Sequence, residues 1–329
     1  MTGMSRKSSW LIFALVLVAL LVLPFFFKNY RVFQFNLVIV YAVAILGLNI
    51  LTGFNGQISL GHGAFYAIGA YTAAILMDHA GMPYWATLPI AGVICFGFGY
   101  LMGFPALRLA GHYLALATFA FALAVPQLLK YKLIEGYTGG VQGIVLTKPK
   151  PPFEFSLFDQ PLSADRWLYI FSLLVAALMF VLAWNLLRGR IGRALIAIRD
   201  HPIAATAMGI NLPVVKSTTF GVSAAYTGVA GALGGIAVAY VAPDSFPVFL
   251  SITLLVGVVV GGLASISGAI FGAIFIQFIP NIADDISKSA PWAIYGAVLI
   301  GLMYLMPGGV MGLVKTLWHR LRPRAAARG

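Results

Sequence analysis

The sequence predicts an all-α membrane protein, a polytopic bundle of about ten transmembrane helices. Its mean hydropathy is +0.95, and 61% of its 329 residues are hydrophobic whereas 9% are charged. Uncharged segments long enough to cross a bilayer follow one another with short gaps. This composition is typical of integral membrane proteins. The excess of basic residues is no sign of nucleic-acid binding, because these residues lie between the apolar segments.

The first seven helices are expected where apolar runs are long enough for one crossing. They cover residues 10–27, 33–51, 61–77, 84–104, 112–129, 167–187 and 217–241. The first run follows Arg6 and Lys7 and resembles a signal peptide. Its 18 apolar residues and the lack of a small-residue cleavage site before Lys28 predict instead a span that is retained.

Residues 245–283 carry no charge and are too long for one crossing at about 1.5 Å per residue. The stretch Gly261–Gly268 (GGLASISG) predicts a tight reversal between two shorter helices at 248–263 and 267–282. A last span is expected at 292–306.

Charge predicts the orientation of the bundle. With both ends inside, 13 Lys and Arg residues fall on the inner side and 8 on the outer side, in agreement with the positive-inside rule. A single crossing over 245–283 would export the basic tail instead. The expected organisation is a cytoplasmic tail at 1–9, a transmembrane domain at 10–313 and a basic cytoplasmic tail at 314–329, with an outer loop at 130–166 and a cytoplasmic loop at 188–216.

Several chemistries are excluded by what the sequence lacks. The single cysteine, Cys95, excludes an intramolecular disulfide and a cysteine metal cluster, and no cofactor or metal is expected. No phosphate-binding loop of the Gly-x4-Gly-Lys-Ser/Thr type is present. None of the predicted spans contains Asp, Glu, Lys or Arg, the usual coupling groups of ion-driven carriers. The chain is therefore not expected to be an enzyme, and any uphill transport would draw energy from another subunit.

The segment Thr52–Gly63 (TGFNGQISLGHG) combines four glycines with polar residues, directly against apolar helices. Irregular backbone at membrane depth occurs where protein or a water-lined cavity satisfies its amides, and transporters use such breaks near the substrate. The free start of the following helix could bind a carboxylate. The alternative is a turn followed by glycine packing, with His62 a packing residue. The candidate pathway residues are Gly53, Asn55, Gln57, Ser59, Gly61, His62, Phe65, Tyr71 and Thr72.

The loop 188–216 holds four arginines, one lysine and one acid, Asp200. Ile191–Arg199 predicts one short amphipathic helix. Pro202 fits the start of a second helix, and Gly209 fits its end. These helices could dock a cytoplasmic partner or simply lie on lipid headgroups.

Small residues recur at four-residue spacing, the close-approach pattern of membrane helices. The pairs are Gly99/Gly103, Gly231/Gly235, Gly257/Gly261 and Gly268/Gly272. Segments 59–76 and 223–241 are both rich in Gly, Ala and Tyr, and they could be weak pseudo-repeats that flank a pathway.

Four stretches together resemble the LivM branch of the branched-chain amino acid ABC permeases. They are SLGHGAFYAIGAYTAAIL (59–76), TGGVQGI (138–144), GRALIAIRDHPIAATAMGIN (192–211) and GVVVGGLASISGAIFGAIF (257–275). The resemblance implies a multi-pass permease subunit in the inner membrane of a bacterium, beside a LivH-like second permease subunit. It also implies two cytoplasmic ABC ATPase subunits and a periplasmic substrate-binding protein.

In that family the loop matching Gly192–Asn211 contacts the ATPase. The resemblance therefore implies ATPase coupling by Gly192, Arg193, Ala194, Ile198, Arg199, Ile203, Ala204, Ala207, Met208 and Gly209. The implied substrates are branched-chain or other hydrophobic amino acids. Related importers also carry urea, amides or aromatic acids, which remain alternatives.

Two other classes of protein remain as rivals. A secondary carrier or channel acting alone is disfavoured by the absence of charge within the spans, and uptake by the purified chain without an ATPase would support it. A membrane subunit with an assembly or respiratory role is the second rival. Neighbouring genes for two ATPases and a secreted binding protein would exclude it.

Overall fold

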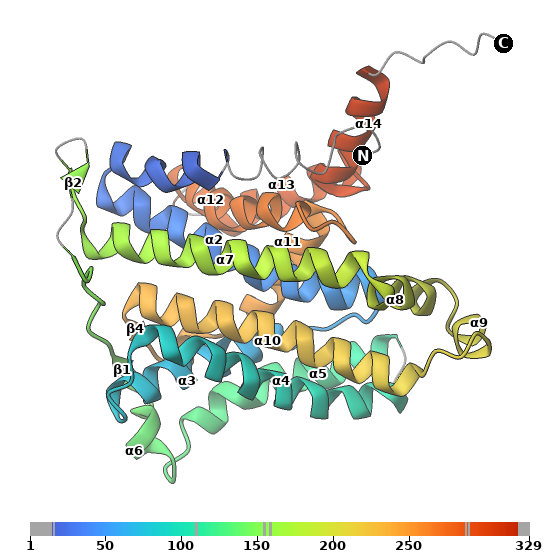
Figure 1. Cartoon of the computed structure of the whole chain (residues 1–329), viewed down its shortest axis with the longest axis horizontal. Helices are drawn as coiled ribbons and strands as arrows, with labels where there is room; N and C mark the ends of the chain where they lie inside the picture. Colours follow the sequence, from blue (N-terminus) through green and yellow to red (C-terminus); the bar gives the residue numbers. More distant parts are fainter. Residues whose placement is uncertain are drawn as a thin grey trace.

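The computed structural model describes residues 15, 17–108, 111–153, 156–157, 160–286, 288 and 290–321. The expected tail at 1–9 and residues 322–329 of the basic tail expected at 314–329 lie outside these residues. Long helices run side by side along the longest axis of the described chain (Figure 1). The predicted fold class, an all-α polytopic bundle, is confirmed.

Each expected span after the first coincides with a helix. These are α2 (Asn29–Asn49), continued by the π-helix η2 (Ile50–Phe54), α3 (His62–Asp78), α4 (Tyr84–Arg108), α5 (His112–Leu129), α7 (Ala164–Arg188), α10 (Leu212–Val238), α11 (Val248–Gly261), α12 (Gly268–Ile286) and α13 (Pro291–Leu305). Within the described residues, eight helices are long and apolar enough to cross a membrane. The remaining two expected spans are α3, with 17 residues, and Leu17–Phe26, which ends in the 3-10 helix η1 (Leu23–Phe26).

The predicted reversal between two helices at Gly261–Gly268 is confirmed. α11 ends at Gly261, and α12 begins at Gly268. Gly262, with φ 115°, adopts a conformation that L side chains rarely reach. The chain then continues beyond α13 into α14 (Gly309–Leu321).

Two helices begin earlier than hydrophobicity alone predicts. α7 begins at Ala164, where Ser163 Oγ accepts a hydrogen bond from the Arg166 amide at 3.4 Å. α10 begins at Leu212, where Asn211 Oδ1 accepts from the Val214 amide at 3.2 Å. Such N-caps extend a helix past the charged residue at which the apolar run stops. The cytoplasmic loop predicted at 188–216 is therefore shorter, at residues 189–211.

The outer loop predicted at 130–166 carries short elements of its own. They are α6 (Glu135–Thr138), β1 (Ile144–Val145), β2 (Ser156–Leu157) and β3 (Gln160–Pro161). β1 pairs antiparallel with β4 (Tyr240–Val241), which η3 (Pro243–Ser245) follows, and β2 pairs with β3. The first pairing joins this loop to the segment that directly follows α10.

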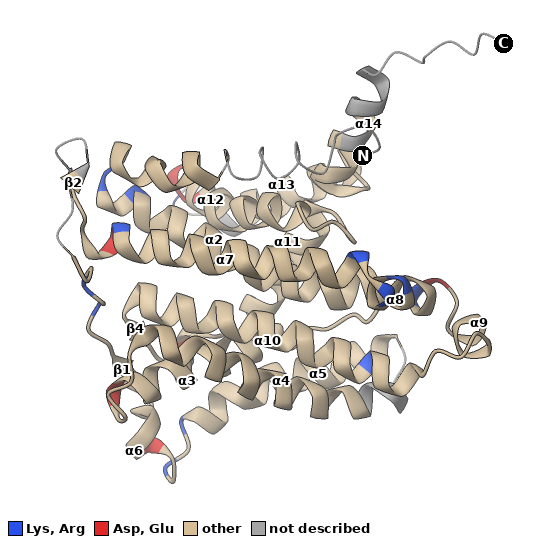
Figure 2. Ribbon diagram, in the orientation of Figure 1, with Lys and Arg blue, Asp and Glu red and all other residues tan. Residues whose placement is uncertain are grey.

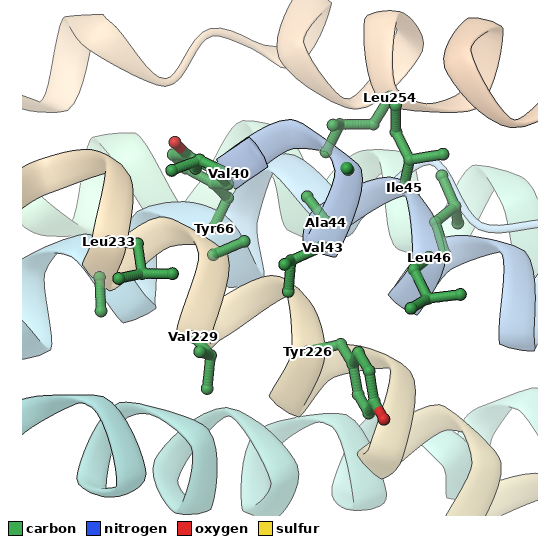
Figure 3. Packing of buried hydrophobic residues seen from close by; sticks show 14 of the residues in the cluster. Val40, Val43, Ala44, Ile45, Leu46, Tyr66, Tyr226, Val229, Leu233 and Leu254 are labelled. Atoms are coloured by element: carbon green, nitrogen blue, oxygen red, sulfur yellow. The ribbon is translucent and has the colours of Figure 1, made fainter. Parts of the chain in front are cut away.

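The core is centred on α10, which packs against α2, α3 and α4. In Figure 3, Val43 and Ala44 of α2 lie in the middle of the cluster. Tyr226 and Val229 of α10 lie on one side of them, and Leu254 of α11 lies on the other. Glycines allow the closest approaches, as the four-residue spacing predicts. A Cβ added at Gly99 would overlap Ala224, and one added at Gly103 would overlap Ser217.

The described charged residues lie at the two ends of the bundle (Figure 2). One end holds the short helices α8 (Arg190–Asp200) and α9 (Pro202–Ala207), and the opposite end holds β1 and α6. This distribution is the one that a membrane-spanning bundle requires, because a charge in the hydrocarbon region is costly.

Candidate functional site

The start of α3 is a buried junction of three helices centred on His62. Its Nδ1 lies 3.0 Å from Ser59 Oγ, and its Nε2 lies 2.7 Å from Ser223 Oγ of α10. Ser223 Oγ donates its single proton to the Gly47 carbonyl of α2 at 2.6 Å. Ser223 must therefore accept from Nε2–H. The ring is fully buried and no acid is among its bonded partners, which favours the neutral form, in which Nδ1 accepts from Ser59. Both ring nitrogens are engaged within the chain, as in a packing histidine.

The backbone amides at the start of α3 are also engaged. Leu60 N donates to Thr118 Oγ1 of α5 at 2.9 Å, and Gly63 N donates to Ser251 Oγ of α11 at 2.8 Å. Gly61 N donates to Ser59 Oγ at 3.3 Å. Helix starts normally leave such amides free for an anion. In this conformation a solute carboxylate would reach these amides only by displacing the hydroxyls of α5 and α11.

The predicted pathway residues separate into three groups along the bundle. Ser59, Gly61, His62 and Phe65 lie together at the start of α3, where Phe65 packs against Phe121 and Phe220. Tyr71 and Thr72 lie farther along α3, toward the end of the bundle that holds β1 and α6. Tyr71 is buried beside Phe246 with no hydrogen-bond partner for its hydroxyl, and Thr72 Oγ1 donates to the Ile68 carbonyl at 2.7 Å.

The third group, Gly53, Asn55 and Gln57, belongs to the segment that contacts both α8 and the start of α10. The Gly53 carbonyl accepts a hydrogen bond from Arg199 Nη1 at 3.0 Å. Gln57 Nε2 donates to the Lys216 carbonyl at 3.4 Å. The structure thus brings part of the predicted pathway into contact with the predicted coupling loop, a juxtaposition that sequence spacing does not reveal.

The two short helices expected in this loop are present as α8 and α9. Leu195 is fully buried, and a Cβ added at Gly192 would overlap the Leu187 backbone, so α8 is held against α7. Pro202 occupies the first turn of α9, and Gly209, with φ 85°, follows its end. Figure 1 shows α9 extending beyond the rest of the bundle at this end.

The residues predicted to contact an ATPase divide by exposure. Ile203 is 78% exposed and Met208 is 84% exposed; Arg193, Ala204, Ala207 and Gly209 are also exposed, and Ala194 is half-buried. Gly192 and Ile198 are buried, so they position α8 and offer no contact surface. Arg199 folds back onto Gly53 and pairs with Asp200 at 2.9 Å. Its guanidinium is thus engaged within the chain, and its part in an ATPase contact stays a prediction.

Four polar residues of the junction were not predicted from the sequence. Thr118, Ser223 and Ser251 supply the hydroxyls around α3, and Asn49 bonds to the α11–α12 reversal. Each is a small polar residue within an apolar span, which is the signal that the sequence offers. No group of three His, Cys, Asp or Glu side chains able to hold a metal ion occurs among the residues that the structure describes.

Comparisons with known proteins identify relatives over most of the chain. The family model described as branched-chain amino acid transport system / permease component matches residues 30–307. The chain is 35% identical to the high-affinity branched-chain amino acid transport system permease protein LivM of Escherichia coli (strain K12), over 92% of this chain and 75% of LivM.

It is 32% identical to LivM of Salmonella typhimurium, over 95% of this chain and 77% of that protein. The permease protein LivH of Escherichia coli (strain K12) is more distant, at 24% identity over 83% of this chain and 91% of LivH. No solved structure matches the chain.

Proposed function

The chain belongs to the branched-chain amino acid transport system permease family, in its LivM branch, and from this we propose that it is a permease subunit of an ABC importer for branched-chain amino acids. It is a multi-pass membrane protein and a transport subunit, with no catalytic chemistry of its own. ATP hydrolysis would reside in partner subunits.

The observation that carries the proposal is the uncovered apolar surface of α9 at the end of the bundle. The side chains of Ile203 and Met208 are largely exposed, whereas the neighbouring helix α8 is packed against the bundle through the buried side chain of Leu195. Exposed apolar side chains on a fixed amphipathic element are typical of a docking surface. A partner ATPase covering this surface could move α8 and α9 as it closes on ATP.

The proposed partners are two cytoplasmic ATPase subunits, a LivH-like second permease subunit and a periplasmic substrate-binding protein. The proposed location is the inner membrane of a bacterium, with both chain ends and α9 on the cytoplasmic side. The positive-inside distribution of Lys and Arg supports this orientation.

We propose that the solute passes beside the junction at the start of α3. Ser59, Gly61, His62 and Phe65 form its centre, Tyr71 and Thr72 lie on the outer side, and Gly53, Asn55 and Gln57 lie toward α8. A carboxylate entering here would take over amides that Thr118 and Ser251 now occupy. Opening of this path would thus replace hydrogen bonds within the chain by hydrogen bonds to the solute, with little net loss of hydrogen bonding.

The test is uptake of radiolabelled leucine, isoleucine and valine into phospholipid vesicles. We expect ATP-dependent uptake when the chain is reconstituted with its second permease subunit, the ATPases and the binding protein. Uptake by the purified chain alone would contradict the proposal and support a secondary carrier or channel. Competition by urea or aromatic acids, but not by leucine, would move the proposed substrate to another class.

A further inference from the structure

Asn49, in the last turn of α2, binds a part of the chain more than 200 residues away. It is fully buried; its Nδ2 donates to the Gly262 carbonyl at 3.3 Å and to the Ser265 carbonyl at 2.9 Å. Its Oδ1 accepts from the Ala264 amide at 3.0 Å. Ala264 has φ 55°, which is uncommon for a residue with a side chain. The reversal between α11 and α12 is therefore held in this conformation by bonds from α2.

The hydrogen bonding of the helix changes directly after Asn49. Ile50–Phe54 forms a π-helix, a rare geometry that is frequent at functional sites. Gly53 in this segment accepts the bond from Arg199, and a Cβ added at Gly53 would overlap Asn49 Oδ1 and Ala264 N. One short segment thus contacts α8 on one side and the α11–α12 reversal on the other.

The residues that follow the π-helix are incompletely hydrogen-bonded. Both amide atoms of Asn55, and Oε1 of Gln57, are buried without a partner. Such groups are rare in folded proteins because desolvation without a hydrogen bond is unfavourable. A second arrangement of this segment that bonds these amides would recover the free energy that their desolvation costs here.

We infer that Asn49 is a positioning residue of the transport cycle, which makes the α11–α12 reversal follow movements of α8. The inference rests on the proposed function, in which partner ATPases move α8 and α9. Motion of α8 displaces the π-helical segment through the bond from Arg199 to Gly53. The three bonds of Asn49 carry that displacement to Gly262–Ser265 and so to the inner ends of α11 and α12.

The first test compares Asn49→Ala with Asn36→Ala in the complete importer, reconstituted in phospholipid vesicles. Asn36 is a matched control, because it lies on the same helix, is equally buried and has an Oδ1 without a partner. We expect Asn49→Ala to lower the leucine transported per ATP hydrolysed by about tenfold, and Asn36→Ala to leave this ratio unchanged. A role in stability alone would reduce the amount of assembled complex without changing the ratio.

Asn49→Asp covers the case in which Asn49→Ala does not assemble. Aspartate keeps an acceptor for the Ala264 amide but loses the donor to Gly262 and Ser265, so we again expect a lower transport ratio. A wild-type ratio in every assembled Asn49 variant would overturn the inference.

The second test follows the reversal itself with a spin label. Ser267→Cys in a Cys95→Ala background carries the only thiol of the chain. We expect ATP with orthovanadate to change the mobility of this label when Asn49 is present and in the Asn36→Ala variant, and not in the Asn49→Ala variant. A preserved change in Asn49→Ala would overturn the inference. If the proposed function itself is wrong, the chain with Asn49 intact will show neither ATP-driven uptake nor a nucleotide-dependent change.

Discussion

At the scale of single residues, His62 illustrates how partners decide between two roles. Its position in SLGHG is compatible with a solute ligand or with a packing residue. In the structure, Ser59 and Ser223 engage both ring nitrogens, and Gly47 takes the proton of Ser223. The direction of these bonds places a proton on Nε2, and the side chain connects α2, α3 and α10.

We therefore expect His62→Ala to affect stability more than transport. The substitution leaves a cavity and unpaired hydroxyls, which should lower the free energy of unfolding by about 1–3 kcal/mol. Thermal unfolding in detergent measures this loss, with exposed His79→Ala as the control. Leucine uptake by the assembled variant should fall little and show no new dependence on pH. A loss of about tenfold in uptake, equivalent to about 1.4 kcal/mol, would indicate instead that His62 binds solute or gates its passage.

At the scale of elements, the close contact of α3 with α10 depends on glycines of each helix that lie directly opposite the backbone of the other. A Cβ added at Gly69 would overlap the Gly228 backbone, and one added at Gly231 would overlap the Tyr66 carbonyl. The predicted pseudo-repeats 59–76 and 223–241 are thus in direct contact here. The backbones of α3 and α10 touch at these positions, and whether the two segments line a pathway stays a prediction.

Gly69→Ala should weaken the bundle by about 1–3 kcal/mol, because overpacking forces backbone shifts. Gly97→Ala on α4 is the matched control, since a Cβ at that position meets nothing within 4 Å. Thermal unfolding of both variants in detergent measures the difference. Equal unfolding temperatures for the two variants would contradict the packing described for α3 and α10.

Acidic substitutions on α8 and α9 test the proposed contact of these helices with the ATPases. Arg193 and Ala204 are exposed, so Arg193→Glu and Ala204→Glu should fold and insert normally. We expect ATP hydrolysis by the assembled importer to lose its link to leucine uptake in both variants. Lys132→Glu, an exposed charge reversal in the outer loop, is the control and should leave the coupling unchanged. Normal uptake with normal expression in both loop variants would exclude a coupling role.

At the scale of the whole molecule, the sequence predicts the helices and much less of their contacts. Apolar length located the spans, and glycine located the reversal between α11 and α12, because both signals are local. The bond of Asn49 to Ala264 joins residues 215 positions apart, and that of Arg199 to Gly53 joins residues 146 apart. A single sequence by itself contains no information on which distant residues form such hydrogen bonds. For the polar junction around α3, the sequence therefore predicted the residues within Thr52–Gly63 but not their partners on the neighbouring helices.

The orientation of the molecule in the membrane is the last prediction, and the single cysteine makes it testable. Cys95 is fully buried and can be replaced by Ala, which leaves a chain without thiols. Met208→Cys then marks the end that holds α9, and Val145→Cys marks the opposite end, both at highly exposed positions. We expect a membrane-impermeant maleimide added outside intact spheroplasts to label Val145→Cys at once and Met208→Cys only after permeabilisation. The reverse pattern would place α9 outside, where no ATP-driven partner could reach it, and would contradict the proposed coupling.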